Sequence, residues 1–317
     1  MDKKIFKEEY KKITNLVQVE FDNFDKHFEE CFSLKTNEDK KNQILPILKE
    51  FFSMKGKRIR SLLLFLLTKA MNREVGDLHY RLAMSDELIH NATLIHDDII
   101  DCSLYRRGKK TLNFDYDSKL AVLAGDYLLC EVLKILSSFS DERVRNIHSK
   151  TMSSMINGEL HQYFNRFKIN SIEEYIEKSK DKTAKLFEAG LVSCAYFNGC
   201  DEETVKRVSE FALNFGTAFQ IQNDLENFEN PDKVNEDIEN GDYSAPLIFY
   251  AKEKYGEDVQ SLNNIKQAVK QLKSTDALKK TEELSKYYIT LAIENISFLE
   301  DNLYKRAIID LCNLFAQ

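Results

Sequence analysis

The most constraining feature of this sequence is a long stretch without proline. The three prolines are Pro46, Pro231 and Pro246, so the residues from Ile47 to Asn230 include none. An interior proline removes a helical hydrogen bond and clashes with the preceding turn, so a stretch without one can form long helices. Valine-rich runs that alternate with polar residues, which would indicate a large sheet, are missing. The sequence therefore predicts an all-α protein.

The spacing of apolar residues predicts where these helices lie. The 317 residues include no internal repeat and no dividing linker, so we expect a single helical domain over residues 1–317. Loops are expected at residues 106–117 and 230–243, the second of them mobile because it combines Pro, Asn, Asp and Gly. Helical spacing predicts helices over residues 1–35, 43–54, 59–72, 79–101, 120–139, 143–167, 171–198 and 202–228, and further helices over 245–317.

Charge and cysteine usage exclude several classes of protein. The net charge is −7 and no basic cluster occurs beyond Lys55–Arg60, so no nucleic-acid partner is expected. The six cysteines include no CxxC pair, which favours a reducing cytoplasm over a disulfide framework. The N-terminal sequence MDKKIFKEEYKK is too charged for a signal peptide. The most apolar run, Leu62–Leu67, is too short to span a bilayer, so we expect a cytoplasmic protein without stable membrane insertion.

The candidate chemistry is concentrated in residues 87–108, ELIHNATLIHDDIIDCSLYRRG. A mostly apolar helix leads to Asp97, Asp98 and Asp101, and Arg106 and Arg107 follow. Asp97 and Asp101 are four residues apart and share a helix face. Two such carboxylates can bind Mg²⁺, and arginines can bind phosphate in forked geometry. The segment therefore suggests a diphosphate site, although acidic clusters at helix ends are more often solvated caps.

A second candidate anion site opens the predicted helix after Gly56. Lys57 and Arg60 are three residues apart and face the same way, at a helix N-terminus where backbone N–H groups favour anions. A solvated basic turn would look the same. His90 lies two turns before Asp97 on one face, which suits contact with a ligand as well as it suits a satisfied core histidine. His96 faces elsewhere and is expected to be structural.

Two later segments give weaker signals. Lys182 and Thr183 lie in KSKDKTAKLFEAG, inside a predicted helix where a lysine is usually exposed. Gln220, Asn223 and Asp224 lie in FQIQNDLEN, an acidic and amide cluster that follows an apolar helix and looks like a weaker copy of the first. A frayed helix end is the alternative interpretation of this second cluster.

Taken in order, these segments resemble the trans-type polyprenyl diphosphate synthase family, most closely its octaprenyl-type members. The resemblance covers roughly residues 50–250. It implies an all-α fold around a deep central cavity, usually as a homodimer. The matching pieces are GKRIR, IHNATLIHDDIIDCSLYRRGKKTLN, AVLAGDYLL, NGEL, DKTAKLFEAG, FGTAFQIQNDLENF and GDYSAPLI.

The resemblance implies the reaction and a role for each matching residue. Isopentenyl diphosphate would add to an allylic diphosphate such as geranyl or farnesyl diphosphate, with two or three Mg²⁺ ions. Excluding water would protect the carbocation that forms when the allylic C–O bond ionises. The implied roles are Mg²⁺ ligation by Asp97, Asp98 and Asp101, contact with the allylic diphosphate by Arg106 and Lys182, binding of isopentenyl diphosphate by Lys57, Arg60, His90 and Arg107, and lining of the carbocation site by Thr183 and Gln220.

The resemblance also indicates where the growing chain would run. The prenyl tail would pass down the helix that carries the aspartates, and Ala92 and Thr93 lie one turn back. Short-chain members of the family often place aromatic residues there, so these small residues imply a medium or long product. Met152, Met155 and Ile156 are candidates for the floor of the tail channel, with plain core packing as the favoured alternative.

The second acidic motif departs from the family pattern DDxxD. Asn223 and Asn227 replace its first and last aspartates, which leaves Asn223 and Asp224 as candidate Mg²⁺ ligands. Asp242 replaces the lysine of the following GKxTxP pattern. An amide binds Mg²⁺ more weakly than a carboxylate, while Glu226 and Lys233 are possible compensations.

Three interpretations of these departures stay open. The first is an active synthase with a modified third-metal site. The second is a non-catalytic or regulatory subunit that pairs with a complete synthase as a heterodimer. The third is a terpene cyclase-like lyase, for which Asn223-Asp224 fits the start of the second motif but Pro231 stands where glutamate is needed. A lyase would also have no use for the isopentenyl diphosphate residues.

Overall fold

The computed structural model describes residues 3–32, 43–53, 56–106, 108–228, 240–256, 259, 265–272 and 274–316. Within these residues almost all regular structure is helical, as the proline-free stretch predicts. The helices are α1 (Lys3–Asn15), α2 (Gln18–Cys31), α3 (Ile44–Phe52), α4 (Ile59–Ala70), α5 (Asp77–Ile100), α6 (Leu112–Asp115), α7 (Ser118–Ser137), α8 (Glu142–Phe164), α9 (Ile172–Ser179), the π-helical turn η2 (Lys180–Ala184), α10 (Lys185–Phe197), α11 (Glu202–Phe228), α13 (Ala245–Tyr255), α14 (Ile265–Leu272), α15 (Ala277–Asn295) and α16 (Leu303–Leu314), and the strands are β1 (Tyr105–Arg106) and β2 (Lys109–Lys110).

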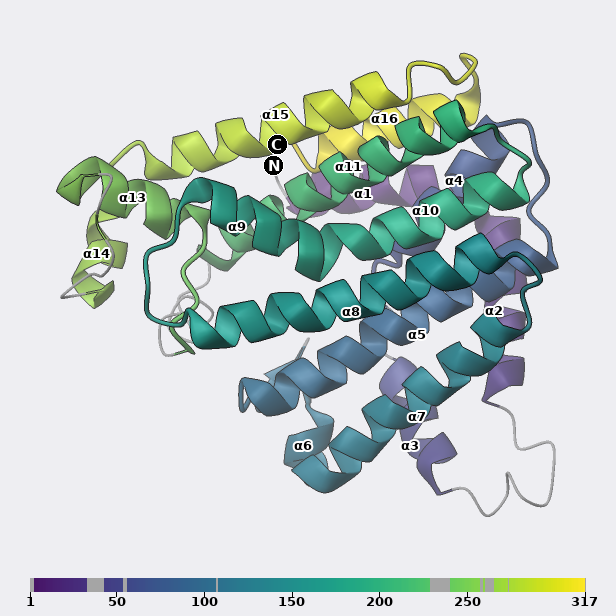
Figure 1. Ribbon diagram of the computed structural model, residues 1–317, viewed down its shortest axis with the longest axis horizontal. Coiled ribbons are helices and arrows are strands. Elements are labelled where there is room, and N and C mark those ends of the chain that lie inside the picture. The colour runs from purple at the N-terminus through teal and green to yellow at the C-terminus, as the bar shows by residue number, and fades with distance from the viewer. Residues whose placement is uncertain are drawn as a thin grey trace.

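The long helices lie in layers, with α15 and α16 on one side and α7 on the other (Figure 1). Between them, α11 packs on α15 and α10, α10 packs on α8 and α5, and α5 packs on α7. Helix α4 is buried on nearly every face, and Leu62–Leu67 are at most 1% exposed. This apolar run is therefore a central core helix. No helix among the described residues has both the length and the hydropathy to cross a membrane.

The structure differs in detail from three local predictions, for the helices over residues 1–35 and 171–198 and for the loop over residues 106–117. Residues 1–35 do not form one helix, because the chain turns at Leu16 and Val17 between α1 and α2. Val17 leaves the helical region (φ −127°, ψ 32°) and its side chain is fully buried. The turn thus lets both helices direct apolar side chains into one core. The predicted helix over 171–198 also contains the π-helical turn η2.

The predicted loop over 106–117 is partly regular. β1 and β2 pair antiparallel, with Arg106 opposite Lys109, and α6 follows. Gly108 has a φ of +79° in the hairpin turn, a conformation that side-chain-bearing residues rarely adopt. Most of the loop predicted over 230–243 lies outside the described residues, and so does Lys233.

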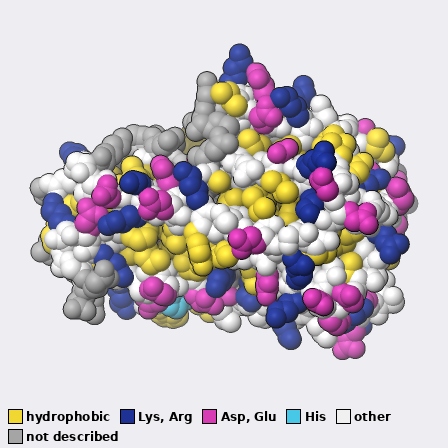
Figure 2. All heavy atoms as spheres, turned by 90° about the horizontal axis from the view of Figure 1, so that it is seen from above, with side chains coloured by type: hydrophobic (Ala, Val, Ile, Leu, Met, Phe, Trp, Pro, Cys, Tyr) yellow, Lys and Arg dark blue, Asp and Glu magenta, His cyan; other side chains and the backbone are white. Residues whose placement is uncertain are grey.

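The surface gives no sign of a large field of one charge on the face shown in Figure 2. Lysine and arginine side chains alternate there with aspartate and glutamate, and apolar side chains lie between them. Such a mixed surface is typical of globular proteins.

Candidate functional site

The last two turns of α5 bring Asp97 into an electrostatic cluster. Its carboxylate interacts with Lys182 and Glu159, and also with Asp101 on its own helix. Burial and the neighbouring carboxylates raise the pKa of Asp97 to about 7, although Lys182 opposes that shift. A buried carboxylate with this pKa is stabilised as an anion by a bound cation, which fits a Mg²⁺ ligand.

Asp98 takes a different role from its neighbour. Asp98 is 2% exposed, its Oδ1 accepts a hydrogen bond from Arg106 Nε at 2.8 Å, and Arg106 Nη2 forms an ion pair with the same oxygen at 2.7 Å. Burial tends to lower the pKa of Arg106, but the ion pair with Asp98 outweighs it and raises the pKa. Asp98 therefore holds Arg106 beside the cluster. Arg107 lies outside the described residues.

The π-helical turn η2 delivers Lys182 and Thr183 to the same cluster. Such turns are rare and often occur at functional sites because they shift side chains out of the helical register. Nζ of Lys182 forms an ion pair with Glu159 and lies 3.4 Å from Gln162 Oε1. Burial lowers the pKa of Lys182, but Asp97 and Glu159 outweigh it and raise the pKa overall. Lys182 is thus a charged side chain positioned by Glu159, and not the exposed lysine that its helical context suggests.

A chain of hydrogen bonds runs from Thr183 to the second acidic motif. Thr183 Oγ1 donates to Gln220 Oε1 at 2.7 Å, and Gln220 Nε2 donates to Asp224 Oδ1 at 2.9 Å. The other carboxylate oxygen of Asp224 accepts from the Tyr175 hydroxyl at 2.6 Å. Burial raises the pKa of Asp224 to about 6 despite the Tyr175 hydrogen bond. Each carboxylate oxygen of Asp224 therefore accepts one hydrogen bond within the protein.

The two candidate metal ligands of the second motif lie in different cavities. Asp224 lines a small cavity of about 50 Å³ together with Lys178, Lys182 and Asp242. Asn223 lines a larger cavity that is described below. Asp242 forms an ion pair with Lys178 at 2.6 Å. Burial raises the pKa of Asp242, but Lys178 outweighs it and the pKa falls.

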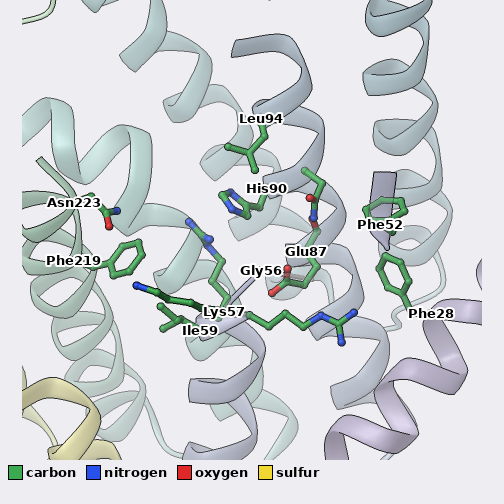
Figure 3. Close-up of a pocket in the computed structure, with 13 residues that line it drawn as sticks. Phe28, Phe52, Gly56, Lys57, Ile59, Glu87, His90, Leu94, Phe219 and Asn223 are labelled. Carbon is green, nitrogen blue, oxygen red and sulfur yellow. The ribbon is translucent and has the colours of Figure 1, made fainter. Parts of the chain in front are cut away.

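We call the larger cavity the cation pocket. Its volume is about 530 Å³, and its lining includes Lys57, Arg60 and His90, which the resemblance assigns to one substrate. In Figure 3 Lys57 extends toward Phe219, and His90 and Leu94 lie on a separate helix. The pocket is lined by Phe28, Phe52, Gly56, Lys57, Arg58, Ile59, Arg60, Glu87, His90, Asn91, Leu94, Phe219 and Asn223.

The polar groups of the cation pocket favour an anion. Nε of Arg60 is buried and has no hydrogen-bond partner among the described residues. An unpartnered buried donor costs free energy unless a ligand accepts from it. Arg58 instead turns away to Asp25, in the left-handed conformation with φ +52°. Lys57 and Arg60 thus remain as the cations of the pocket.

The metal-binding capacity of the site depends on more than protein ligands. Within the described ranges, no three His, Cys, Asp or Glu side chains gather closely enough to hold a metal ion by themselves. Asp97 and Asp101 can supply two carboxylates, and Mg²⁺ readily takes its other ligands from water and phosphate oxygens. The donor set therefore fits Mg²⁺ that is shared with a bound diphosphate.

The candidate channel residues differ in burial. Ala92 is fully buried, and Thr93 is half-buried with its hydroxyl donating to the His90 carbonyl at 2.8 Å. Met155 is buried, whereas Ile156 is 61% exposed. His96 packs against Gly125 on α7, away from the cluster.

Sequence reasoning did not assign a role to Glu159, Gln162, Lys178 or Tyr175. Glu159 lies in the NGEL piece of the resemblance, so that motif was the available signal. Lys178 lies one turn before Lys182, and this spacing places both on one side of the α9–η2 segment. Tyr175 has no signal in the sequence alone, because its partner Asp224 is distant along the chain.

Comparisons with known proteins agree with this geometry. The family model described as polyprenyl synthetase matches residues 41–284. A prenyl transferase from Synechocystis sp. is 30% identical over 275 residues, which cover 82% of this chain and 85% of that protein. Octaprenyl diphosphate synthase from Escherichia coli is 28% identical over 279 residues, covering 83% and 86%.

A solved structure has the same fold. It is a polyprenyl synthase from Caulobacter crescentus CB15 complexed with calcium and isoprenyl diphosphate, which aligns with a TM-score of 0.84 and 22% identity over 97% of each chain. The family model covers more than half of the chain, and the first relative covers more than two thirds. This chain therefore belongs to the polyprenyl synthetase family.

Proposed function

We propose that this chain adds isopentenyl diphosphate to geranyl or farnesyl diphosphate and makes a medium or long trans-polyprenyl diphosphate. The observation that supports the proposal is that α5 contributes to two separate, differently built groups of charged side chains. One is the Asp97 cluster, in which carboxylates and cations alternate. The other is the cation pocket, which has Lys57, Arg60 and His90. Condensation of two diphosphates needs two such sites, of which only one must promote ionisation.

The Asp97 cluster is suited to the allylic diphosphate. Mg²⁺, as two or three ions on Asp97 and Asp101 with Asn223 or Asp224 nearby, would supply Lewis-acid stabilisation of the leaving diphosphate. Lys182 and Arg106 are held at the cluster by Glu159 and Asp98 and donate to the same leaving group. These fixed charges stabilise the transition state because they need no reorientation when the allylic C–O bond breaks.

The hydrogen-bond chain through Thr183 and Gln220 suits the carbocation that remains. Thr183 is buried, and its hydroxyl donates to Gln220, so its oxygen lone pairs stay available to the positive charge. Burial also keeps water from quenching the cation. The alkene of isopentenyl diphosphate, bound in the cation pocket, attacks the allylic carbon, and the proton then lost passes to the departing diphosphate.

A medium or long product follows from the small residues on α5. Small side chains at Ala92 and Thr93 would admit a growing tail along the helix below Asp97, where a bulky residue would block it. The name of the Escherichia coli relative, octaprenyl diphosphate synthase, supports the same range of product length. The exact length depends on the floor of the channel.

A homodimer in the cytoplasm is the assembly we propose. Exposed apolar side chains gather on α7 and α8, among them Leu123, Leu133, Ile156, Leu160 and Tyr163. Neighbouring apolar side chains of this kind favour a protein–protein interface. A heterodimer would use the same surface.

The second motif gives a specific reason to keep one alternative. Each carboxylate oxygen of Asp224 accepts a hydrogen bond inside the protein, and Asn223 is an amide in the other cavity. A weak third-metal site favours the non-catalytic subunit, whereas Asp97, Lys182 and Arg106 favour the active synthase. The lyase is disfavoured because the cation pocket would have no ligand.

The test is a prenyl-transfer assay with Mg²⁺, labelled isopentenyl diphosphate and farnesyl diphosphate, with products resolved by chain length. A ladder that ends at one long product supports the active synthase. Binding of farnesyl diphosphate without incorporation supports the subunit. A cyclised hydrocarbon from farnesyl diphosphate alone supports the lyase.

A further inference from the structure

In the cation pocket, the charged groups of Lys57 and Arg60 lie over the faces of aromatic rings. Nζ of Lys57 lies 4.6 Å from the centre of the Phe6 ring and 5.5 Å from that of Phe315. The guanidinium carbon of Arg60 lies 4.6 Å from the centre of the Phe187 ring. All three distances are short enough for attraction between a cation and the face of a ring. Among the described residues, no carboxylate forms an ion pair with Lys57 or Arg60.

The rings form one continuous row, which we call the aromatic row: Phe6, Phe315, Phe219 and Phe187. Successive ring centres are 5.6 Å, 5.2 Å and 5.7 Å apart, and each pair meets edge to face. Edge-to-face contact at these separations is favourable. The four residues come from α1, from the position directly after α16, from α11 and from α10. Elements distant in sequence therefore combine to build one support.

Helix α1 also fixes the backbone of Lys57. The Tyr10 hydroxyl donates a hydrogen bond to the Lys57 carbonyl, and the Tyr10 ring stacks on Phe6 at 5.8 Å. Burial raises the pKa of Tyr10 above its usual value, so the hydroxyl stays protonated and remains a donor. One turn of α1 thus holds both the main chain and the side chain of Lys57.

This mode of support leaves the charge of Lys57 available, while Arg60 also interacts electrostatically with the buried carboxyl groups of Glu87 and Asp86. A carboxylate partner would neutralise a lysine or arginine, whereas an aromatic ring attracts the cation without removing its net charge. Glu87 is the carboxylate in the lining of the pocket, and it accepts a hydrogen bond from Ser61 at 3.1 Å. Burial raises the pKa of Glu87, whereas the charges of Arg60 and Arg58 oppose that shift.

We propose that the aromatic row positions the cations that bind isopentenyl diphosphate, with Phe6 and Phe315 as positioning residues for Lys57 and Phe187 as the positioning residue for Arg60. The inference rests on the proposed function for the identity of the ligand. The row holds Lys57 and Arg60 in place by ring contacts and without ion pairs to any described residue, so that both can bind the second diphosphate without metal.

The experiment compares Phe6→Leu, Phe6→Tyr and Lys57→Met with the wild-type protein. Phe6 is half-buried, so its replacement disturbs the core less than replacement of the buried Phe315. Phe6→Leu is expected to raise the KM for isopentenyl diphosphate about fivefold, because one of two cation–ring contacts is lost. In Phe6→Leu, kcat and the KM for farnesyl diphosphate should stay unchanged. Phe6→Tyr should keep the wild-type KM for isopentenyl diphosphate. Lys57→Met should raise that KM more than Phe6→Leu does.

Phe21→Leu is the matched control. Phe21 is half-buried on α2, and its ring packs edge-on against Phe65 at 5.4 Å without touching Lys57. An equal rise in KM in Phe21→Leu, or an unchanged KM in Phe6→Leu while Lys57→Met loses binding, overturns the inference. If the wild type transfers no prenyl group, the proposed function fails separately. Calorimetric titration with inorganic diphosphate then tests the aromatic row. Phe6→Leu should bind inorganic diphosphate more weakly than the wild type by the same factor, and Phe21→Leu should bind it as the wild type does.

Discussion

The two halves of the site hold their cations in opposite ways. At the Asp97 cluster, Lys182 pairs with Glu159 and Arg106 pairs with Asp98. In the cation pocket, Lys57 stands over Phe6 and Phe315, and Arg60 stands over Phe187. Carboxylates therefore support the cations on one side, and aromatic rings support them on the other.

The difference explains why one diphosphate would need metal and the other would not. Carboxylate partners cancel the charge of Lys182 and Arg106, and Asp97 and Asp101 add further negative charge. A diphosphate approaching that side is repelled until Mg²⁺ reverses the balance. The rings beneath Lys57 and Arg60 do not neutralise them, so even with Glu87 and Asp86 near Arg60 the cation pocket keeps more positive charge for a diphosphate than the Asp97 cluster does. The metal then acts only where a bond must ionise.

The largest expected effect follows from removing Asp97. Asp97→Ala should reduce prenyl transfer about a thousandfold, because a bound metal supplies several kcal/mol of transition-state stabilisation. Binding of isopentenyl diphosphate should stay within about twofold, since the two sites share no partner. Steady-state assays and calorimetry measure both quantities. Asp115→Ala, at an exposed acid on α6, is the control, and near-normal transfer by Asp97→Ala would remove Asp97 from the metal site.

Removing the metal tests the same division without mutation. In excess EDTA, the affinity for a non-ionisable farnesyl diphosphate analogue should fall about a hundredfold, because several kcal/mol of charge neutralisation are lost. The affinity for isopentenyl diphosphate should change little. Readdition of Mg²⁺ serves as the control. Equal losses for both ligands would mean that the cation pocket also depends on metal, and the comparison would be wrong.

The sequence predicted one half of this comparison far better than the other. The proline-free stretch indicates the helices, and the four-residue spacing places Asp97 and Asp101 on one face, because both signals are local. The aromatic row is not local. Phe6 and Phe315 come from opposite ends of the chain, and nothing in their neighbouring residues indicates that both face Lys57.

The same limit applies to the partners of the second motif. The replacement of aspartate by Asn223 is visible in the sequence, but the hydrogen bond from Tyr175 to Asp224 is not. The π-helical turn at Lys182 is also hidden, because its sequence has ordinary helical spacing. Packing between distant helices decides these features.

A bulky residue on α5 should affect only one of the two substrates. It should block the tail of the allylic substrate, and the length of the product measures that effect. Ala92→Phe should shorten the product by blocking the tail of the allylic substrate, while the KM for isopentenyl diphosphate stays the same. Because Ala92 is fully buried, overpacking should also cost about 1–3 kcal/mol of stability. Thr93→Phe at the half-buried next position is the companion variant. Unchanged product length in both variants, measured by chromatography, would show that the tail takes another route.

The smallest expected effect concerns Asn223, which lies at the boundary between the two halves. It belongs to the second acidic motif, yet its side chain lines the cation pocket (Figure 3). A carboxylate there could serve the metal or oppose Lys57, and the two outcomes are separable. Asn223→Asp should lower the Mg²⁺ concentration for half-maximal activity about threefold, because a carboxylate is a stronger Mg²⁺ ligand than an amide.

The KM for isopentenyl diphosphate discriminates between the two sides. If Asn223→Asp raises that KM and leaves the Mg²⁺ dependence unchanged, position 223 belongs to the cation pocket, where a new carboxylate would neutralise Lys57. Asn227→Asp, one turn further along α11, is the matched control, because it adds the same charge to a residue that does not line the pocket. A lower Mg²⁺ requirement in Asn223→Asp alone would therefore assign this position to the metal side despite its place in the lining of the cation pocket.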